Sequence, residues 1–136
     1  MPTEPGLPSD DAHAHAQWLR ALRALDERVS RHELAPAQRD AVLGLWRELS
    51  ARAEGLRRPQ IGPTADGRYF LAWAYEDVPR LVVTIEVEAD GRCEWFLRGP
   101  GPGDLTEGTE GEGSTEATVA ALAHRMTSFA VARPGA

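Results

Sequence analysis

The sequence predicts an α+β fold in which helices cover a three-stranded antiparallel meander, in the order α-α-β-β-β-α. Between Gly67 and Arg98, residues alternate with a period of two, as in strands whose side chains face opposite sides of a sheet. On both sides of this stretch, apolar residues recur every three or four positions, which is the period of an amphipathic helix. With 136 residues, the chain can bury one core. We expect a single domain over 10–133, with tails at 1–9 and 134–136.

Two helices are expected before the meander, at 10–33 and 36–57. Ser9, Asp10 or Asp11 can cap the first helix, and Pro36 suits the first turn of the second. The linker between them is short, so the sequence predicts an αα-hairpin. The apolar stripes are Trp18, Leu22, Leu25 and Val29 in the first helix, and Val42, Trp46, Leu49, Ala53 and Leu56 in the second.

The three strands are expected at 68–75, 80–88 and 92–98. Asp90-Gly91 favours a tight hairpin, but that register would bring Val87 opposite Glu94, so we expect a bulge or a slightly longer loop there. Around Ile61, flanking prolines exclude a central strand and leave either a short edge strand or an extended strap.

The segment 99–113 consists mainly of glycine, acid and threonine. Such a composition buries little apolar area to offset the entropy of ordering, so we expect a mobile acidic loop. A last helix is expected at 114–131, with the stripe Val119, Leu122, Met126 and Phe129.

Composition excludes several functions. The chain has no lysine, which rules out Schiff-base and P-loop chemistry. Lysine and asparagine are both absent, and their AT-rich codons suggest a high-GC bacterial genome. The net charge of −6 argues against nucleic-acid binding. A single cysteine, no bilayer-spanning apolar run and no secretory signal predict a cytoplasmic protein.

No catalytic, metal or cofactor site is expected. His13 and His15 lie two positions apart on a helix and so point to different sides. Cys93 falls on the apolar face of a strand, where a cysteine is more often inert core than nucleophile. The acids near the second hairpin are more often exposed charges than paired catalytic carboxylates; they are Glu86, Glu88, Asp90 and Glu94. We therefore expect a protein that is not an enzyme.

Tryptophan is the most informative residue type, because it is favoured at protein interfaces. The predicted partner-binding residues are Trp18, Leu22, Trp46, Trp73 and Trp95. The alternative is a small-ligand or nucleotide-sensing domain with a pocket between sheet and helices. That pocket would be lined by Trp73, Tyr75 and Trp95, with Arg68 or Arg98 supplying a polar group.

From Pro59 to Phe96 the chain resembles a family of small uncharacterised bacterial proteins. The resemblance covers less than a third of the chain and departs from the family pattern at Arg68 and Ala72. The matching residues are Ile61, Pro63-Thr64, Asp66-Gly67, Leu71, Trp73, Val83, Ile85, Val87 and Asp90-Gly91.

The resemblance implies no activity and no catalytic residue. Some of these proteins resemble accessory genes of mobile elements, or of defence and toxin–antitoxin loci. Together with the tryptophans, this predicts a protein-binding module that acts as an immunity-like, antitoxin-like or accessory subunit. We expect it to bind another protein or itself, as a dimer formed through the first two helices, and to have no membrane partner.

Overall fold

The computed structural model of the chain describes residues 10–75, 81–100 and 106–131. The expected tails and the first hairpin turn (76–80) lie outside these residues. The helices are α1 (Asp10–Ser30), α2 (Pro36–Arg52) and α3 (Thr115–Val131). The strands are β1 (Gln60–Pro63), β2 (Tyr69–Tyr75), β3 (Leu81–Val87), β4 (Cys93–Pro100) and β5 (Thr106–Gly113).

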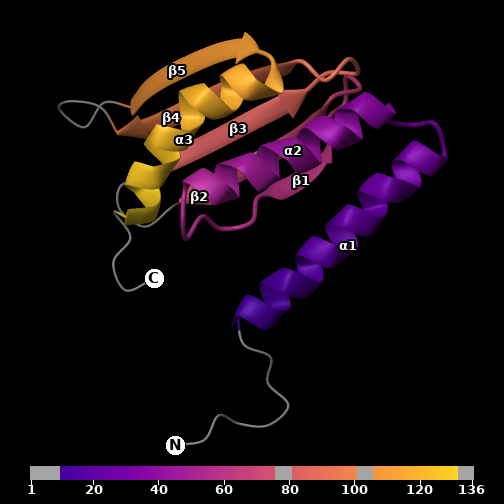
Figure 1. The fold of residues 1–136 in the computed structure, drawn as a ribbon, viewed down its shortest axis with the longest axis horizontal. Coiled ribbons are helices and arrows are strands. Elements are labelled where there is room, and N and C mark those ends of the chain that lie inside the picture. The colour runs from indigo at the N-terminus through magenta and orange to yellow at the C-terminus, as the bar shows by residue number, and fades with distance from the viewer. Residues whose placement is uncertain (1–9, 76–80, 101–105, 132–136) are drawn as a thin grey trace, which may run out of the picture.

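The five strands form one antiparallel sheet in the order β1-β2-β3-β4-β5. Helices α2 and α3 lie side by side across one face of this sheet, while α1 diverges from α2 and stands beyond the β1 end (Figure 1). The fold is therefore α+β, as predicted, with a helix first and last. Of the two alternatives that the sequence leaves open around Ile61, the structure shows the short edge strand, β1.

The predicted period of two correctly separates the faces of the central strands. Every second residue from Tyr69 to Trp73, from Val83 to Val87 and from Cys93 to Leu97 is buried against the helices. The helices contribute the other half of the core, in which the largest fully buried side chains are Leu25, Val42, Leu45, Leu49, Leu122 and Met126.

The prediction of three strands and a mobile loop at 99–113 is wrong. Strand β4 continues to Pro100, and 106–113 forms β5, which pairs with β4 throughout its length. On the core face of β5, position 111 has room only for glycine. A Cβ at Gly111 would lie 2.5 Å from Cζ2 of Trp95, its partner in the register. Backbone pairing and the tryptophan, rather than large side chains on β5, hold this strand in the sheet.

The hairpin between β3 and β4 has the longer loop that the sequence predicts. Glu88 N–H donates to Arg92 O at 2.8 Å, and Gly91 N–H donates back to Glu88 O at 2.9 Å. Gly91 has φ +90°, a conformation that glycine adopts without a Cβ penalty. The loop therefore brings Val87 opposite Cys93, and both side chains enter the core.

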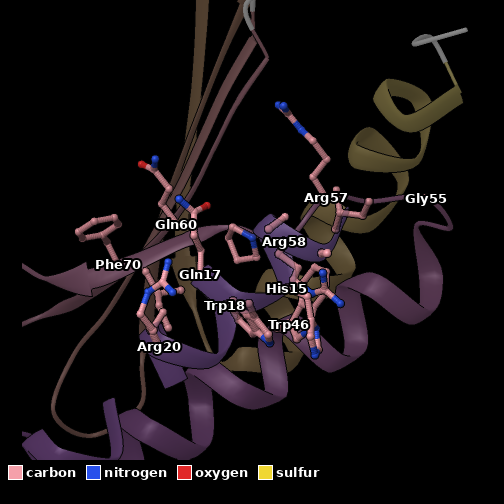
Figure 2. A pocket seen from close by; sticks show the side chains of 16 residues that line it. His15, Gln17, Trp18, Arg20, Trp46, Gly55, Arg57, Arg58, Gln60 and Phe70 are labelled. Atoms are coloured by element: carbon pink, nitrogen blue, oxygen red, sulfur yellow. The ribbon is translucent and has the colours of Figure 1, made fainter. Parts of the chain in front are cut away.

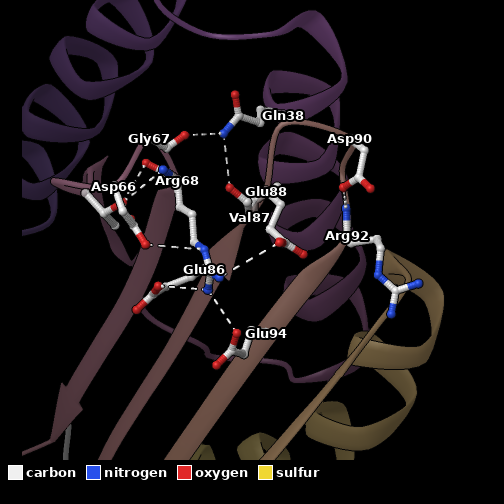
Figure 3. Close-up of polar contacts among 11 residues, drawn as sticks. Gln38, Asp66, Gly67, Arg68, Glu86, Val87, Glu88, Asp90, Arg92 and Glu94 are labelled. Atoms are coloured by element: carbon white, nitrogen blue, oxygen red, sulfur yellow. Dashed lines mark hydrogen bonds and ion pairs between the residues drawn. The ribbon is translucent and has the colours of Figure 1, made fainter.

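A buried glutamine fastens the start of α2 to the sheet. The Gln38 Nε2 group donates to the carbonyls of Gly67 at 3.0 Å, in the turn before β2, and Val87 at 3.1 Å, at the end of β3 (Figure 3). Its Oε1 accepts from Ala35 N–H at 3.1 Å, which caps the helix. One side chain thus supplies hydrogen bonds to three backbone groups, of which the Val87 carbonyl is buried, where water cannot supply a substitute.

Candidate functional site

The second face of the sheet carries no helix in the described part of the chain. Residues directly opposite one another in neighbouring strands share this face, so the register arranges them in rows. The middle row on β2, β3 and β4 is Ala72, Thr84 and Phe96, and it continues to Glu110 on β5. We call the uncharged, half-buried residues of β2 to β4 on this side of the sheet the sheet face: Phe70, Ala72, Val82, Thr84 and Phe96.

An acidic row borders the sheet face at one end of the strands. Glu86 lies opposite Glu94, and Glu94 lies opposite Glu112, so three carboxylates follow one another across β3, β4 and β5. Like charges placed directly opposite one another destabilise a sheet. The row therefore needs a cation.

Arg68, just before β2, supplies that cation. Its guanidinium lies 2.9 Å from Glu94 and 3.4 Å from Glu86, with Glu88 at 3.8 Å and Asp66 at 3.6 Å (Figure 3). The hydrogen bond with Glu94 is the main cause that raises the pKa of Arg68. The Thr64 hydroxyl donates to Asp66, and this hydrogen bond is the main cause that lowers the pKa of that carboxyl. Arg68 therefore forms its ion pairs within the chain.

Three other charges on this surface have no such partner. Among the side chains that the structure describes, Arg98, Glu110 and Glu112 make no ion pair or hydrogen bond. Arg98 lies opposite Val82, at the end of the strands away from the acidic row, and Glu110 lies opposite Phe96. The surface therefore has an apolar centre, an acidic end and one free arginine at the other end.

Two of the predicted binding tryptophans lie in the core. Trp73 is buried and donates its indole N–H to Arg57 O at 2.7 Å. Trp95, 8% exposed, lies against Gly111 beneath the helices. Arg68 and Arg98 are on the opposite face of the sheet, so the structure does not bring them together with Trp73 and Trp95 as a pocket would need. The side chain of Tyr75 lies outside the described part of the structure.

The other predicted contact residues lie on α1 and α2, and the two tryptophans among them join these helices. The Trp18 and Trp46 ring centroids are 5.5 Å apart, and the rings are inclined at 56°. Trp18 is buried, while Trp46 and Leu22 are half-buried. The large hydrophobic side chain that does stand exposed on α1 is Leu19, at 48%.

A groove opens between α1 and the segment that leads from α2 into β1. It has a volume of about 1310 Å³. Figure 2 shows the side chains of 16 residues around it, with Trp18 and Trp46 among them. Its charged lining residues are all arginines, Arg20, Arg57 and Arg58, and His15 also lines it.

The described residues offer no catalytic constellation. Burial is the main cause that raises the pKa of the Cys93 thiol, which keeps it protonated, and its Sγ contacts Gly91 O at 3.6 Å. In the described ranges no cluster of three or more histidine, cysteine or acidic side chains could hold a metal ion. Nor does any helix within these ranges have the length and apolar character that a bilayer span requires.

No family model matches this chain, and no curated protein or solved structure is significantly similar to it. The indications of function therefore come from the geometry of the sheet face and of the groove.

Proposed function

We propose that this chain is a non-enzymatic protein-binding module whose contact surface is the sheet face, and that a second copy of the chain is its first partner. The observation that carries this proposal is a five-stranded sheet with helices on one face and an apolar centre on the other. A sheet with apolar residues on both sides gains stability when a second layer covers the open side.

The open side of the whole sheet, of which the sheet face is the uncharged centre, is large enough for a second copy. A five-stranded sheet with strands of about seven residues presents roughly 24 Å by 23 Å, or about 550 Å² in projection. Accessible area exceeds projected area, so such a face approaches the roughly 800 Å² per partner that a standard interface buries. Two such faces can pack as an aligned sandwich about 10 Å apart.

The charges favour one orientation of that second copy. A two-fold axis lying in the interface, perpendicular to the strands and passing through the Phe96 row, would bring Phe96 against its own counterpart. It would also place Arg98 over the partner's acidic end, near Glu94 and Glu112. Arg98 and Glu112, which lack partners in one chain, would then lie close together across the interface, whereas Glu110, in the Phe96 row, would face its own counterpart. The pairing of Arg98 with Glu112 would set the register.

The helices are a less suitable contact surface than the sequence alone predicts. Trp18 and Trp46 already contact each other within one chain, and α2 faces the sheet. The exposed Leu19 alone offers little apolar area. A role as an immunity-like, antitoxin-like or accessory subunit stays a prediction from the resemblance, in which the same face would bind a different protein.

Charge reversal tests this function. Arg98→Glu places an acid over the partner's acidic end and should weaken the dimer, as measured by the dissociation constant in sedimentation equilibrium. Glu112→Arg added to Arg98→Glu should restore much of the affinity, because the pair is then exchanged. Equal weakening by the single and the double variant would show that these charges do not face each other.

A further inference from the structure

The groove between α1 and β1 is a second recess, and Phe70 is the residue of the sheet face that also lines it. Its walls are α1 from Ala12 to Ala21, the segment from Gly55 to Gln60, and β1 (Figure 2). At about 1310 Å³ it is larger and more open than a pocket for one small molecule.

The groove is cationic in a chain whose net charge is −6. No aspartate or glutamate is among its lining residues, whereas Arg20, Arg57 and Arg58 all are. Arg57 donates to Ala74 O at 2.6 Å. Among the described side chains, Arg20 and Arg58 have no hydrogen-bond or ion-pair partner. Two unpaired arginines in a recess favour an anionic occupant.

The tryptophans of the groove do not favour a nucleotide base. A base needs an open aromatic face on which to stack. Trp18 is buried, and its ring lies against that of Trp46 at a centroid distance of 5.5 Å. These rings therefore form an apolar floor rather than a stacking platform.

One wall of the groove is the free edge of the sheet. Strand β1 pairs with β2 on one side, and in the described structure no strand lies on its other side. Thr64 N–H donates to Arg68 O, which marks a hydrogen-bonded pair just beyond the strand. Because hydrogen-bonded and non-hydrogen-bonded pairs alternate in an antiparallel ladder, the backbone groups of Ile61 point toward the free edge.

We propose that this groove binds an extended acidic peptide segment, which adds to the free edge of β1 and presents carboxylates to Arg20 and Arg58. Adding a strand to an exposed edge supplies main-chain hydrogen bonds, while the side chains of the groove select the sequence. The wall from Ala12 to Ala21 is about 14 Å long, enough for about four extended residues.

Fluorescence anisotropy with labelled peptides tests this site. The probe is a peptide of about eight residues that alternates glutamate with valine, titrated with the full chain in low salt. The comparison peptides replace each glutamate by glutamine or methylate alternate backbone amides. We expect the glutamate peptide to bind and both comparison peptides to bind at least about tenfold more weakly.

The variants assign the binding to the groove. Arg20→Gln with Arg58→Gln should weaken binding about fivefold. The control pair is Arg23→Gln, on α1, with Arg31→Gln, in the turn after α1. It removes the same charge from exposed positions outside the groove and should change affinity less than about twofold.

Four results would overturn the proposal. The glutamine peptide or the methylated peptide could bind as tightly as the glutamate peptide, or the Arg23/Arg31 pair could lose as much affinity as the Arg20/Arg58 pair. In the fourth, ATP would displace the labelled peptide at a lower concentration than unlabelled peptide does. The last result would assign the groove to small anions. None of these results depends on whether the sheet face forms a dimer.

Discussion

The indole of Trp95 packs directly on Gly111, so that position 111 has no room for a side chain. The indole of Trp95 lies where a side chain at 111 would be, with its Cζ2 at 2.5 Å from the position of a Cβ. Gly111→Ala should therefore lower the free energy of unfolding by about 1–3 kcal/mol, because an extra methyl group in a packed core forces neighbours to move. Urea denaturation followed by tryptophan fluorescence measures this change.

Gly44→Ala is the matched control for that substitution. A Cβ at Gly44 would contact Arg47 Nη2 at 3.9 Å, an ordinary distance, and Gly44 lies within α2. Replacing a helical glycine by alanine should stabilise the chain by up to about 1 kcal/mol. The same loss of stability in both variants would contradict the packing of Trp95 on β5.

Gln38→Ala should cost about 2–3 kcal/mol, because the buried carbonyl of Val87 loses its side-chain donor where water cannot replace it. Gly67 O and Ala35 N–H also lose their partner. Thermal or urea denaturation measures the loss. Gln17→Ala, on the exposed surface of α1, serves as the control and should stay within about 0.5 kcal/mol. If Gln38→Ala were as mild as the control, the link between α2 and the strand ends would be dispensable.

Asp66 should stabilise the chain in a pH-dependent way. Its pKa in the folded chain lies below the ordinary value of 3.8, mainly because Thr64 donates a hydrogen bond to it. The ionised carboxylate therefore stabilises the fold above pH 3.8, and this contribution is lost as the pH falls through the lower, folded pKa.

Denaturation of Asp66→Asn at several pH values measures that contribution. The variant should be less stable than the wild type at neutral pH and equally stable in strong acid. Gln17→Ala, at an exposed position of α1 and without a titratable side chain, is the control and should differ from the wild type by the same amount at every pH. A constant difference between wild type and Asp66→Asn at all pH values would contradict the lowered pKa.

The Cys93 thiol should be almost unreactive in the native chain. It is buried, and burial raises its pKa, so little thiolate is present near neutral pH. Labelling with a disulfide reagent should be slow in buffer and immediate in denaturant. Fast labelling of the folded chain would instead indicate an accessible thiolate and reopen the question of a nucleophile.

The strands that follow the period-two rule could be predicted because their side chains alternate in polarity. Trp73, Val83 and Trp95 enter the core for that reason. Strand β5 could not be found this way. Its core face offers Thr109, Gly111 and Gly113, and it is held by pairing with β4 and by contact with Trp95, which only the tertiary structure reveals.

The binding surfaces divide in the same way. Tryptophan content alone predicted a binding role for Trp73 and Trp95, whose side chains lie in the core. The predicted pocket also combined them with arginines that lie on the opposite face of the sheet. The sequence did contain a signal for the sheet face. Phe70, Ala72 and Val82 are apolar, although the alternating residues on the other face of the same strands are apolar too. The groove depends on how α1 diverges from the sheet, which no local pattern encodes.

Sedimentation equilibrium of the wild type and Phe96→Asp tests the sheet-face dimer most directly, with Leu19→Asp as the control on the exposed surface of α1. Circular dichroism first establishes that each variant is folded. We predict a dimer for the wild type and Leu19→Asp, and a folded monomer for Phe96→Asp. A wild type that stays monomeric at high concentration, or a dimer that Leu19→Asp dissociates and Phe96→Asp leaves intact, would contradict the account.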